Sequence, residues 1–141
     1  VRTLIDSGPL VALLKSDEEH HRWVADAFRQ LPAAGLSTCE AVISEVCFLL
    51  ARWPLAIDGL FRRLGDGKLA LLPLDTDSAA IHGLMKRYRN VPASYADACL
   101  VRLSERHPEA SLLTLDSDFE VYRRNGREVI PVLAPFRGRG R

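Results

Sequence analysis

The stretch Val1-Arg2-Thr3-Leu4-Ile5-Asp6-Ser7-Gly8 decides how the rest of the chain is interpreted. Its short apolar run, Thr3 to Ile5, predicts a buried strand. The strand stops at Asp6, and Pro9 then suits the first turn of a helix. Because ligands of open α/β sheets bind at the carboxyl ends of the strands, we expect the Asp6 carboxylate to lie where a ligand binds.

The composition is that of an ordinary globular domain. The chain has 141 residues, of which 48% are hydrophobic and 26% charged, as in a typical single domain. Its formal net charge of +1 excludes a global basic field of the kind that marks many nucleic-acid binders, and leaves local patches open. No apolar run reaches the ~18 residues of a membrane-spanning helix, and no signal peptide precedes the first strand. We therefore expect a cytoplasmic protein without a membrane partner.

The three cysteines, Cys39, Cys47 and Cys99, show no CxxC pairing. Each lies in an apolar helical context. This pattern predicts buried free thiols in a reducing compartment rather than a disulfide or a zinc site.

Strands and helices alternate along the chain. Strands are predicted at 3–5, 35–37, 69–74, 111–115 and 129–133, and helices at 9–15, 17–31, 39–52, 55–64, 77–89, 94–107 and from 117. This alternation predicts an α/β fold with a central parallel sheet of four to five strands and helices on both faces. The domain is expected to span 1–136, followed by a flexible basic tail at 137–141.

Several features refine these elements. The run at 69–74 is best interpreted as a central strand. The helix at 39–52 is apolar around most of its circumference, which predicts that it is buried. Three pairs have the spacing of a capping box at a helix N-terminus: Ser16 with Glu19, Ser37 with Glu40, and Ser94 with Asp97.

Four carboxylates stand out by their context. Asp6 and Asp116 follow predicted strands, whereas Glu45 and Asp97 lie on or near apolar helix faces. The three aspartates also have structural interpretations, since Asp is a common helix cap and Asp97 suits the capping box. Glu45 cannot cap because it lies in mid-helix, and an unpaired Glu is almost never fully buried. A functional role for Glu45 and an ion pair with Arg52 both remain open.

If these four acids converge, their repulsion must be offset. Two like charges about 5 Å apart repel by roughly 3 kcal/mol at an effective dielectric near 20, so four would cost on the order of 10 kcal/mol, comparable to the stability of a domain. Such a cluster requires protons or cations. Oxygen ligands without His or Cys favour Mg²⁺ or Mn²⁺ over zinc. Ser7 and Thr114 flank two of the acids and could bind a water or a phosphate oxygen.

Four motifs together resemble the PIN domain, specifically the toxin nucleases of the VapBC type, over nearly the whole chain. They are Leu4-Ile5-Asp6-Ser7, Ser44-Glu45-Val46, Ala96-Asp97-Ala98 and Thr114-Leu115-Asp116-Ser117-Asp118-Phe119. The resemblance implies a Mg²⁺- or Mn²⁺-dependent ribonuclease with an acidic cluster of Asp6, Glu45, Asp97 and Asp116. Asp118 would add a further acid, and Thr114 would supply the usual hydroxyl. The resemblance also implies a homodimer and a cognate VapB-like antitoxin whose peptide covers the site.

The chemistry of the acids agrees with this resemblance. Divalent ions held by carboxylates polarise a phosphodiester and lower the pKa of a bound water, so no protein nucleophile is needed. Basic clusters occur at 62–63, 86–89 and 123–127 and in the tail, and each is ordinary by itself. Those near the Asp116 strand are candidates for contact with a phosphate backbone.

Two alternatives belong to other functional classes. A phosphatase of the haloacid dehalogenase type also begins with a strand that ends in Asp, but it needs a second Asp two residues later, where Gly8 stands. The other alternative is a non-catalytic PIN module that binds RNA or protein, and the full acidic set argues against it.

Overall fold

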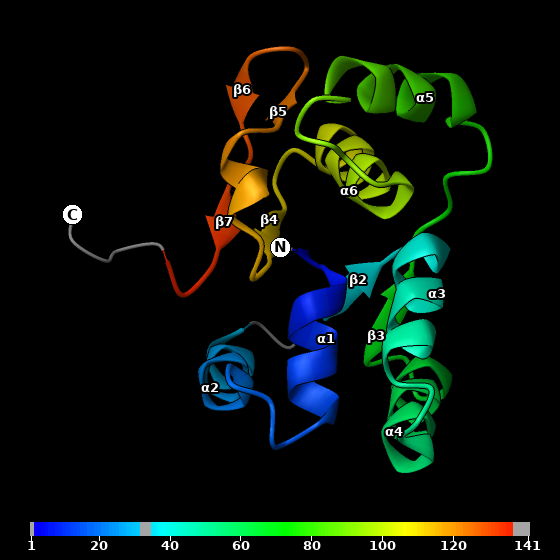
Figure 1. Ribbon diagram of the computed structural model, residues 1–141, viewed down its shortest axis with the longest axis vertical. Coiled ribbons are helices and arrows are strands. Elements are labelled where there is room, and N and C mark those ends of the chain that lie inside the picture. The colour runs from blue at the N-terminus through cyan, green and yellow to red at the C-terminus, as the bar shows by residue number, and fades with distance from the viewer. Residues whose placement is uncertain (1, 32–34, 137–141) are drawn as a thin grey trace.

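The computed structural model describes residues 2–31 and 35–136, and the predicted tail at 137–141 lies outside them. The described residues form an α/β domain (Figure 1). Its strands are β1 (Thr3–Ile5), β2 (Leu36–Thr38), β3 (Leu69–Leu71), β4 (Ser111–Leu113), β5 (Arg123–Arg124), β6 (Glu128–Val129) and β7 (Val132–Leu133). Its helices are α1 (Ser7–Leu14), α2 (His21–Gln30), α3 (Glu40–Leu49), α4 (Pro54–Gly65), α5 (Ser78–Arg87), α6 (Tyr95–Arg106) and the 3₁₀ helix η1 (Ser117–Glu120).

The central sheet is parallel and has the strand order β3-β2-β1-β4-β7. Strand β1 lies in its middle, with Leu4 opposite Ser37 of β2 and Leu112 of β4. Leu4 and Ile5 are fully buried, as expected for a strand covered on both faces. The predicted fold class, a parallel sheet with flanking helices, is confirmed.

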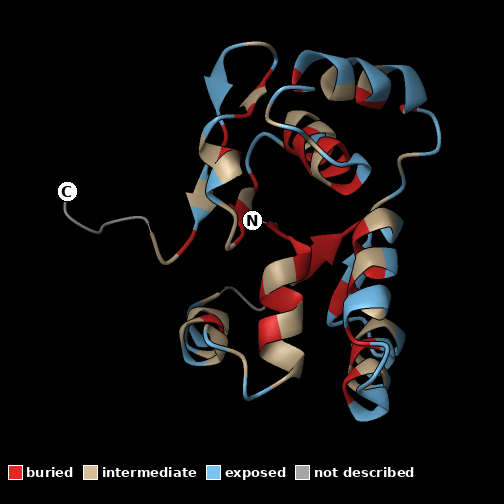
Figure 2. Ribbon diagram, in the orientation of Figure 1, coloured by how far each residue is buried: buried red, intermediate tan, exposed pale blue. Residues whose placement is uncertain are grey.

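The helices lie on either side of the sheet. In Figure 1, α1 and α2 lie below β1 and β2, α3 stands beside β2 and β3 with α4 below it, and α5 and α6 lie above these strands. The buried residues concentrate between these layers (Figure 2). The thiols of Cys39 and Cys99 are buried there as predicted, whereas Cys47 is half-buried, and all three are free. None of the described helices is both long and apolar enough to cross a membrane.

Strand β3 is an edge strand, so the prediction of a central strand at 69–74 was wrong. Only Leu69 to Leu71 pair with β2, and Leu71 is 42% exposed. An apolar run indicates burial but does not specify how many neighbours a strand has.

Helix α3 is not buried on all sides as predicted. Val42, Ile43 and Val46 face the core, but Phe48 is 81% exposed and Leu49 46% exposed. The apolar residues of this helix exceed what one core can cover. The helix therefore presents an apolar face to solvent, a feature that often marks an interaction site.

Of the three predicted capping boxes, only that of Ser94 and Asp97 forms, at the start of α6. Helix α2 begins later than predicted, with His20 at its N-cap and no side-chain cap, so Ser16 and Glu19 do not form a box. Ser37 lies within β2, where it accepts a hydrogen bond from Arg2. In these two cases the capping-box spacing occurs in segments that form a turn or a strand instead of a helix start.

The segment predicted as one last strand divides in two. Strand β6 pairs antiparallel with β5 as a hairpin, and β7 joins the parallel sheet beside β4. Asn125 and Gly126 make the hairpin turn with φ of 52° and 85°. This hairpin was not predicted.

Candidate active site

Asp6 lies at the end of the central strand and begins α1. Its side-chain Oδ1 accepts a hydrogen bond from the backbone N–H of Ser7 at 2.7 Å, so it does cap the helix. Its Oδ2 accepts one from the hydroxyl of Thr114 at 2.8 Å. Asp6 is only 5% exposed. The capping interpretation is therefore correct, yet the carboxylate also lies at the edge where ligands of such sheets bind.

An open pocket of about 560 Å³ lies at this carboxyl edge of the sheet. It is lined by Asp6, Ser7, Gly8, Glu45, Ser94, Asp97, Leu115, Asp116 and Ser117. All four predicted acids line it, and each comes from a different part of the fold. None of the described lysines or arginines does. The pocket therefore concentrates negative charge with no built-in cation.

Glu45 reaches this pocket from the middle of α3. It is half-buried and accepts a hydrogen bond from the hydroxyl of Ser7. Among the ion pairs of the described residues, none joins Glu45 to Arg52. The structure thus replaces the ion-pair interpretation with a hydrogen bond inside the acidic pocket.

Asp97 and Asp116 both have local hydrogen-bond donors. The Asp97 carboxylate accepts from the Ser94 N–H at 3.1 Å within the capping box, and from the Tyr122 hydroxyl at 3.3 Å. Asp116 follows β4 and accepts from the Asp118 N–H at 2.9 Å, so it caps η1. Their structural roles are real and coexist with their place in the pocket.

The two hydroxyl residues predicted beside the acids connect them. Ser7 joins Asp6 to Glu45 through its backbone N–H and its hydroxyl. Thr114 is fully buried beneath Asp6, and its hydroxyl oxygen also accepts the Asp116 N–H at 3.0 Å. Neither Thr114 nor Asp118 is among the residues that line the pocket.

The electrostatics of the pocket oppose the ionised state of its acids. Burial raises the pKa of Asp6 to about 6, although the hydrogen bonds from Thr114 and Ser7 lower it, and the charges of Asp97 and Glu45 raise it further. Burial also raises the pKa of Asp97, and the charge of Asp116 adds to this. A site of this kind gains stability from a bound proton or cation.

The donor atoms fit a hard divalent cation, because they are carboxylate and hydroxyl oxygens. Among the described residues, however, no three His, Cys, Asp or Glu side chains converge closely enough to hold a metal ion as they stand. The hydrogen bonds explain this: Glu45 is turned toward Ser7, Asp97 toward Ser94 and Tyr122. Convergence on a cation therefore requires side-chain rotations.

Tyr122 is a residue of this site that the sequence did not reveal. It is fully buried, and its hydroxyl donates to Asp97 from a position 25 residues away along the chain. Burial and the surrounding acids raise the pKa of the phenol, which keeps it a donor. No local motif signals this contact, because it depends on η1 leading back toward α6.

The chain is similar to a known protein family in sequence and to a solved structure in fold. The family model of the PIN domain matches residues 3–125, a range that includes all four acids. No curated protein matches the chain. Among solved structures, the fold is similar to that of Mycobacterium tuberculosis VapC20, described as a sarcin-ricin loop cleaving toxin. The two share 19% sequence identity with a TM-score of 0.69, and the match covers 84% of this chain and 93% of that one.

Proposed function

This chain belongs to the PIN domain family, and we propose that it is a Mg²⁺- or Mn²⁺-dependent endoribonuclease. One observation carries the proposal: four carboxylates from separate elements line a single pocket at the carboxyl edge of the sheet, with no described lysine or arginine beside them. Such a concentration of acids costs stability. A cluster with this cost favours a function that uses a cation.

Asp6, Glu45, Asp97 and Asp116 would hold the metal. A bound divalent ion supplies Lewis-acid polarisation of the phosphodiester and a water of lowered pKa. Asp118 lies just outside the pocket lining and would contribute from the periphery.

The protein's own contribution is to position these acids. Thr114 and the Ser7 N–H hold the two oxygens of Asp6, which is the only one of the four acids that is buried. Glu45 is half-buried and receives one side-chain hydrogen bond, from Ser7, so it is the acid best placed to rotate and orient a water. The Ser7 hydroxyl is engaged with Glu45, and no side chain is needed as a nucleophile. Hydrolysis would leave 5′-phosphate and 3′-hydroxyl ends.

We also propose that the chain is the toxin of a toxin–antitoxin pair, as the description of VapC20 suggests. A groove of about 340 Å³ shares Gly8 and Leu115 with the acidic pocket and extends to Leu49 and Trp53. This extension, which Lys15, Glu18 and His20 also line, would seat a VapB-like peptide that reaches the acids.

A homodimer is the second proposed assembly. Phe48 on α3 and Leu55 and Phe61 on α4 are 81%, 83% and 53% exposed. Burial of such side chains is worth about 1.5–3 kcal/mol each. We expect size-exclusion chromatography with light scattering to give the mass of a dimer for the parent protein. The double variant Phe48→Ser with Leu55→Ser should shift this mass toward that of a monomer. A parent that stays monomeric at high concentration would contradict this assembly.

The decisive test is cleavage of stem–loop RNAs, the sarcin–ricin loop among them. The parent should cleave with Mg²⁺ and lose activity in EDTA, and Asp6→Asn should be inactive. Asp58→Asn, which alters an exposed acid on α4 outside the pocket, is the matched control and should cleave normally.

The outcomes separate the alternatives. Cleavage that survives both EDTA and Asp6→Asn would refute a metal nuclease of this design. Binding of RNA without cleavage under any metal would indicate a non-catalytic PIN module. Hydrolysis of small phosphomonoesters without RNA cleavage would instead support the phosphatase interpretation.

A further inference from the structure

A second charged feature lies outside the acidic pocket, where the end of α5 meets the β5–β6 hairpin. Segments 86–89 and 123–129 contain six basic residues and one acid, Glu128, and so carry +5 in a chain whose total is +1. Four of the basic residues are exposed: Lys86, Arg87, Arg89 and Arg127. We call these four the basic surface.

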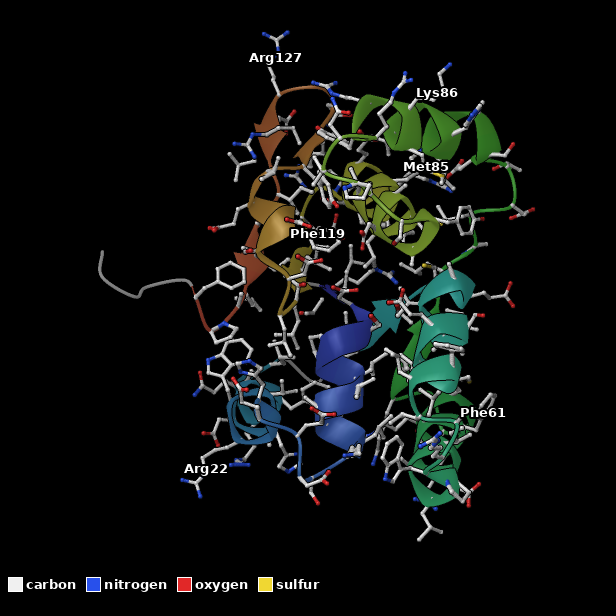
Figure 3. The ribbon with its side chains drawn as sticks, viewed as in Figure 1. Arg22, Phe61, Met85, Lys86, Phe119 and Arg127 are labelled. Atoms are coloured by element: carbon white, nitrogen blue, oxygen red, sulfur yellow. The ribbon has the colours of Figure 1, made fainter. Side chains whose placement is uncertain are left out.

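The basic surface is not neutralised by the protein itself. None of its four residues forms an ion pair with another described residue. By contrast, Arg124 of the same hairpin is buried and pairs with Glu128. In Figure 3, Lys86 and Arg127 point outward at the same end of the molecule, one from α5 and the other from the hairpin. The four charges are therefore available to an external anion.

Specific contacts hold the two parts of the basic surface together. The Arg87 guanidinium donates to the Gly126 carbonyl at 2.6 Å, which joins α5 to the hairpin turn. The backbone N–H of Arg123 donates to the Tyr88 hydroxyl at 2.9 Å. The basic residues thus lie on one fixed platform rather than on independent loops.

The same contacts connect the platform to the acidic pocket. The rings of Tyr88 and Tyr122 meet at 5.1 Å between centroids, and the Tyr122 hydroxyl donates to Asp97. Ser94, which lines the pocket, follows Arg89 by five residues, a span of at most about 18 Å for an extended chain. Arg89, the member of the basic surface nearest to Ser94 in sequence, is therefore about five nucleotide spacings or less from the pocket lining, since phosphates of a stacked strand recur about every 3.4 Å.

We propose that the basic surface binds the phosphate backbone of the RNA strand beside the bond that is cut, an inference that rests on the proposed nuclease function. An acidic pocket repels phosphates, so affinity for the backbone has to come from cations nearby. Arginine suits this task because its planar guanidinium pairs with two phosphate oxygens. Contacts of this kind position the strand without reading its sequence.

The test measures RNA binding separately from cleavage. A labelled stem–loop RNA is titrated in EDTA, by fluorescence anisotropy, across about 50 to 200 mM salt. The test variant is Lys86→Gln with Arg127→Gln, because neither side chain makes a hydrogen bond or ion pair with the described residues. The control, Arg62→Gln with Lys68→Gln, removes the same charge from exposed positions in α4 and just before β3.

We expect the test variant to bind RNA about tenfold more weakly and to lower the salt slope by about 1.4, since each phosphate contact on a single strand contributes about 0.7. The control should bind like the parent. In cleavage, the test variant should raise KM and leave kcat unchanged.

Equal affinity and equal salt slope in the test variant and the control would overturn the inference. The inference would also be overturned if polyglutamate, added at the same total charge, displaced the RNA. The basic surface would then be suited to an acidic protein. If the parent binds RNA but does not cleave it, weaker RNA binding by the test variant still supports the proposed role of the basic surface. Only the proposed nuclease function then fails.

Discussion

Replacing Asp6 with asparagine should stabilise the metal-free protein at neutral pH. The pKa of Asp6 is raised from 3.8 to about 6, so its ionisation costs the folded state about 3 kcal/mol at pH 7. Asparagine keeps an oxygen for the Ser7 N–H but leaves the Thr114 hydroxyl without its acceptor, at a cost of about 1 kcal/mol. We expect Asp6→Asn to be more stable by about 2 kcal/mol, or about 6 °C in Tm.

The pH dependence of this difference identifies its origin. Because the folded state binds the Asp6 proton more tightly than the unfolded chain, the parent loses stability as pH rises from 3.8 toward about 6. Asp6→Asn has no such ionisation. Its advantage should therefore be present at pH 7 and disappear near pH 4.

The assay is urea unfolding followed by circular dichroism in EDTA at several pH values, with Asp58→Asn as the control for an exposed acid. The control should change stability little at any pH. An Asp6→Asn protein that is less stable than the parent at pH 7, or a difference that does not vary with pH, would refute the reasoning. The helix cap and its hydrogen bonds would then dominate the role of Asp6.

Three further predictions concern the same pocket. Mg²⁺ should stabilise the parent by about 2.7 kcal/mol at a hundred times its Kd, and should stabilise Asp6→Asn and Asp97→Asn less; equal stabilisation would locate the metal elsewhere. Thr114→Val removes a hydrogen bond that lowers the pKa of Asp6, so the acid limb of the cleavage profile should move to higher pH, and an unchanged limb would contradict this role. Tyr122→Phe keeps the ring packing but removes the hydrogen bond to Asp97, which should cost about 1 kcal/mol of stability and a larger factor in cleavage; full activity would show that Asp97 needs no such support.

The location of two acids could be predicted because it follows from local rules. Asp6 comes directly after β1, Asp116 comes three residues after the end of β4, and these strands are parallel neighbours. Parallel neighbours end at the same edge of a sheet, so acids that follow them lie close together. Asp97 was also predictable in its structural role, since the capping box with Ser94 forms as its spacing indicates.

The incorrect predictions share a cause. An apolar run indicates that a segment is buried somewhere, but not how many neighbours it has. Leu69 to Leu71 therefore form an edge strand, and Phe48 and Leu49 remain exposed on a helix that buries only one face. Likewise, Ser37 had the spacing of a cap, but pairing with the neighbouring strands extended β2 through that position.

The local sequence pattern is enough to establish the alternation of strands and helices, because it follows from hydrophobic periodicity. The same pattern shows four acids at the ends of strands or on or near apolar helix faces. Contacts between distant segments required the tertiary structure. The hydrogen bonds of Ser7 to Glu45 and of Tyr122 to Asp97 join residues 38 and 25 positions apart, and the basic surface joins α5 to a hairpin that begins much later in the chain. Such contacts depend on how packed elements are oriented, which residue spacing along the chain does not encode.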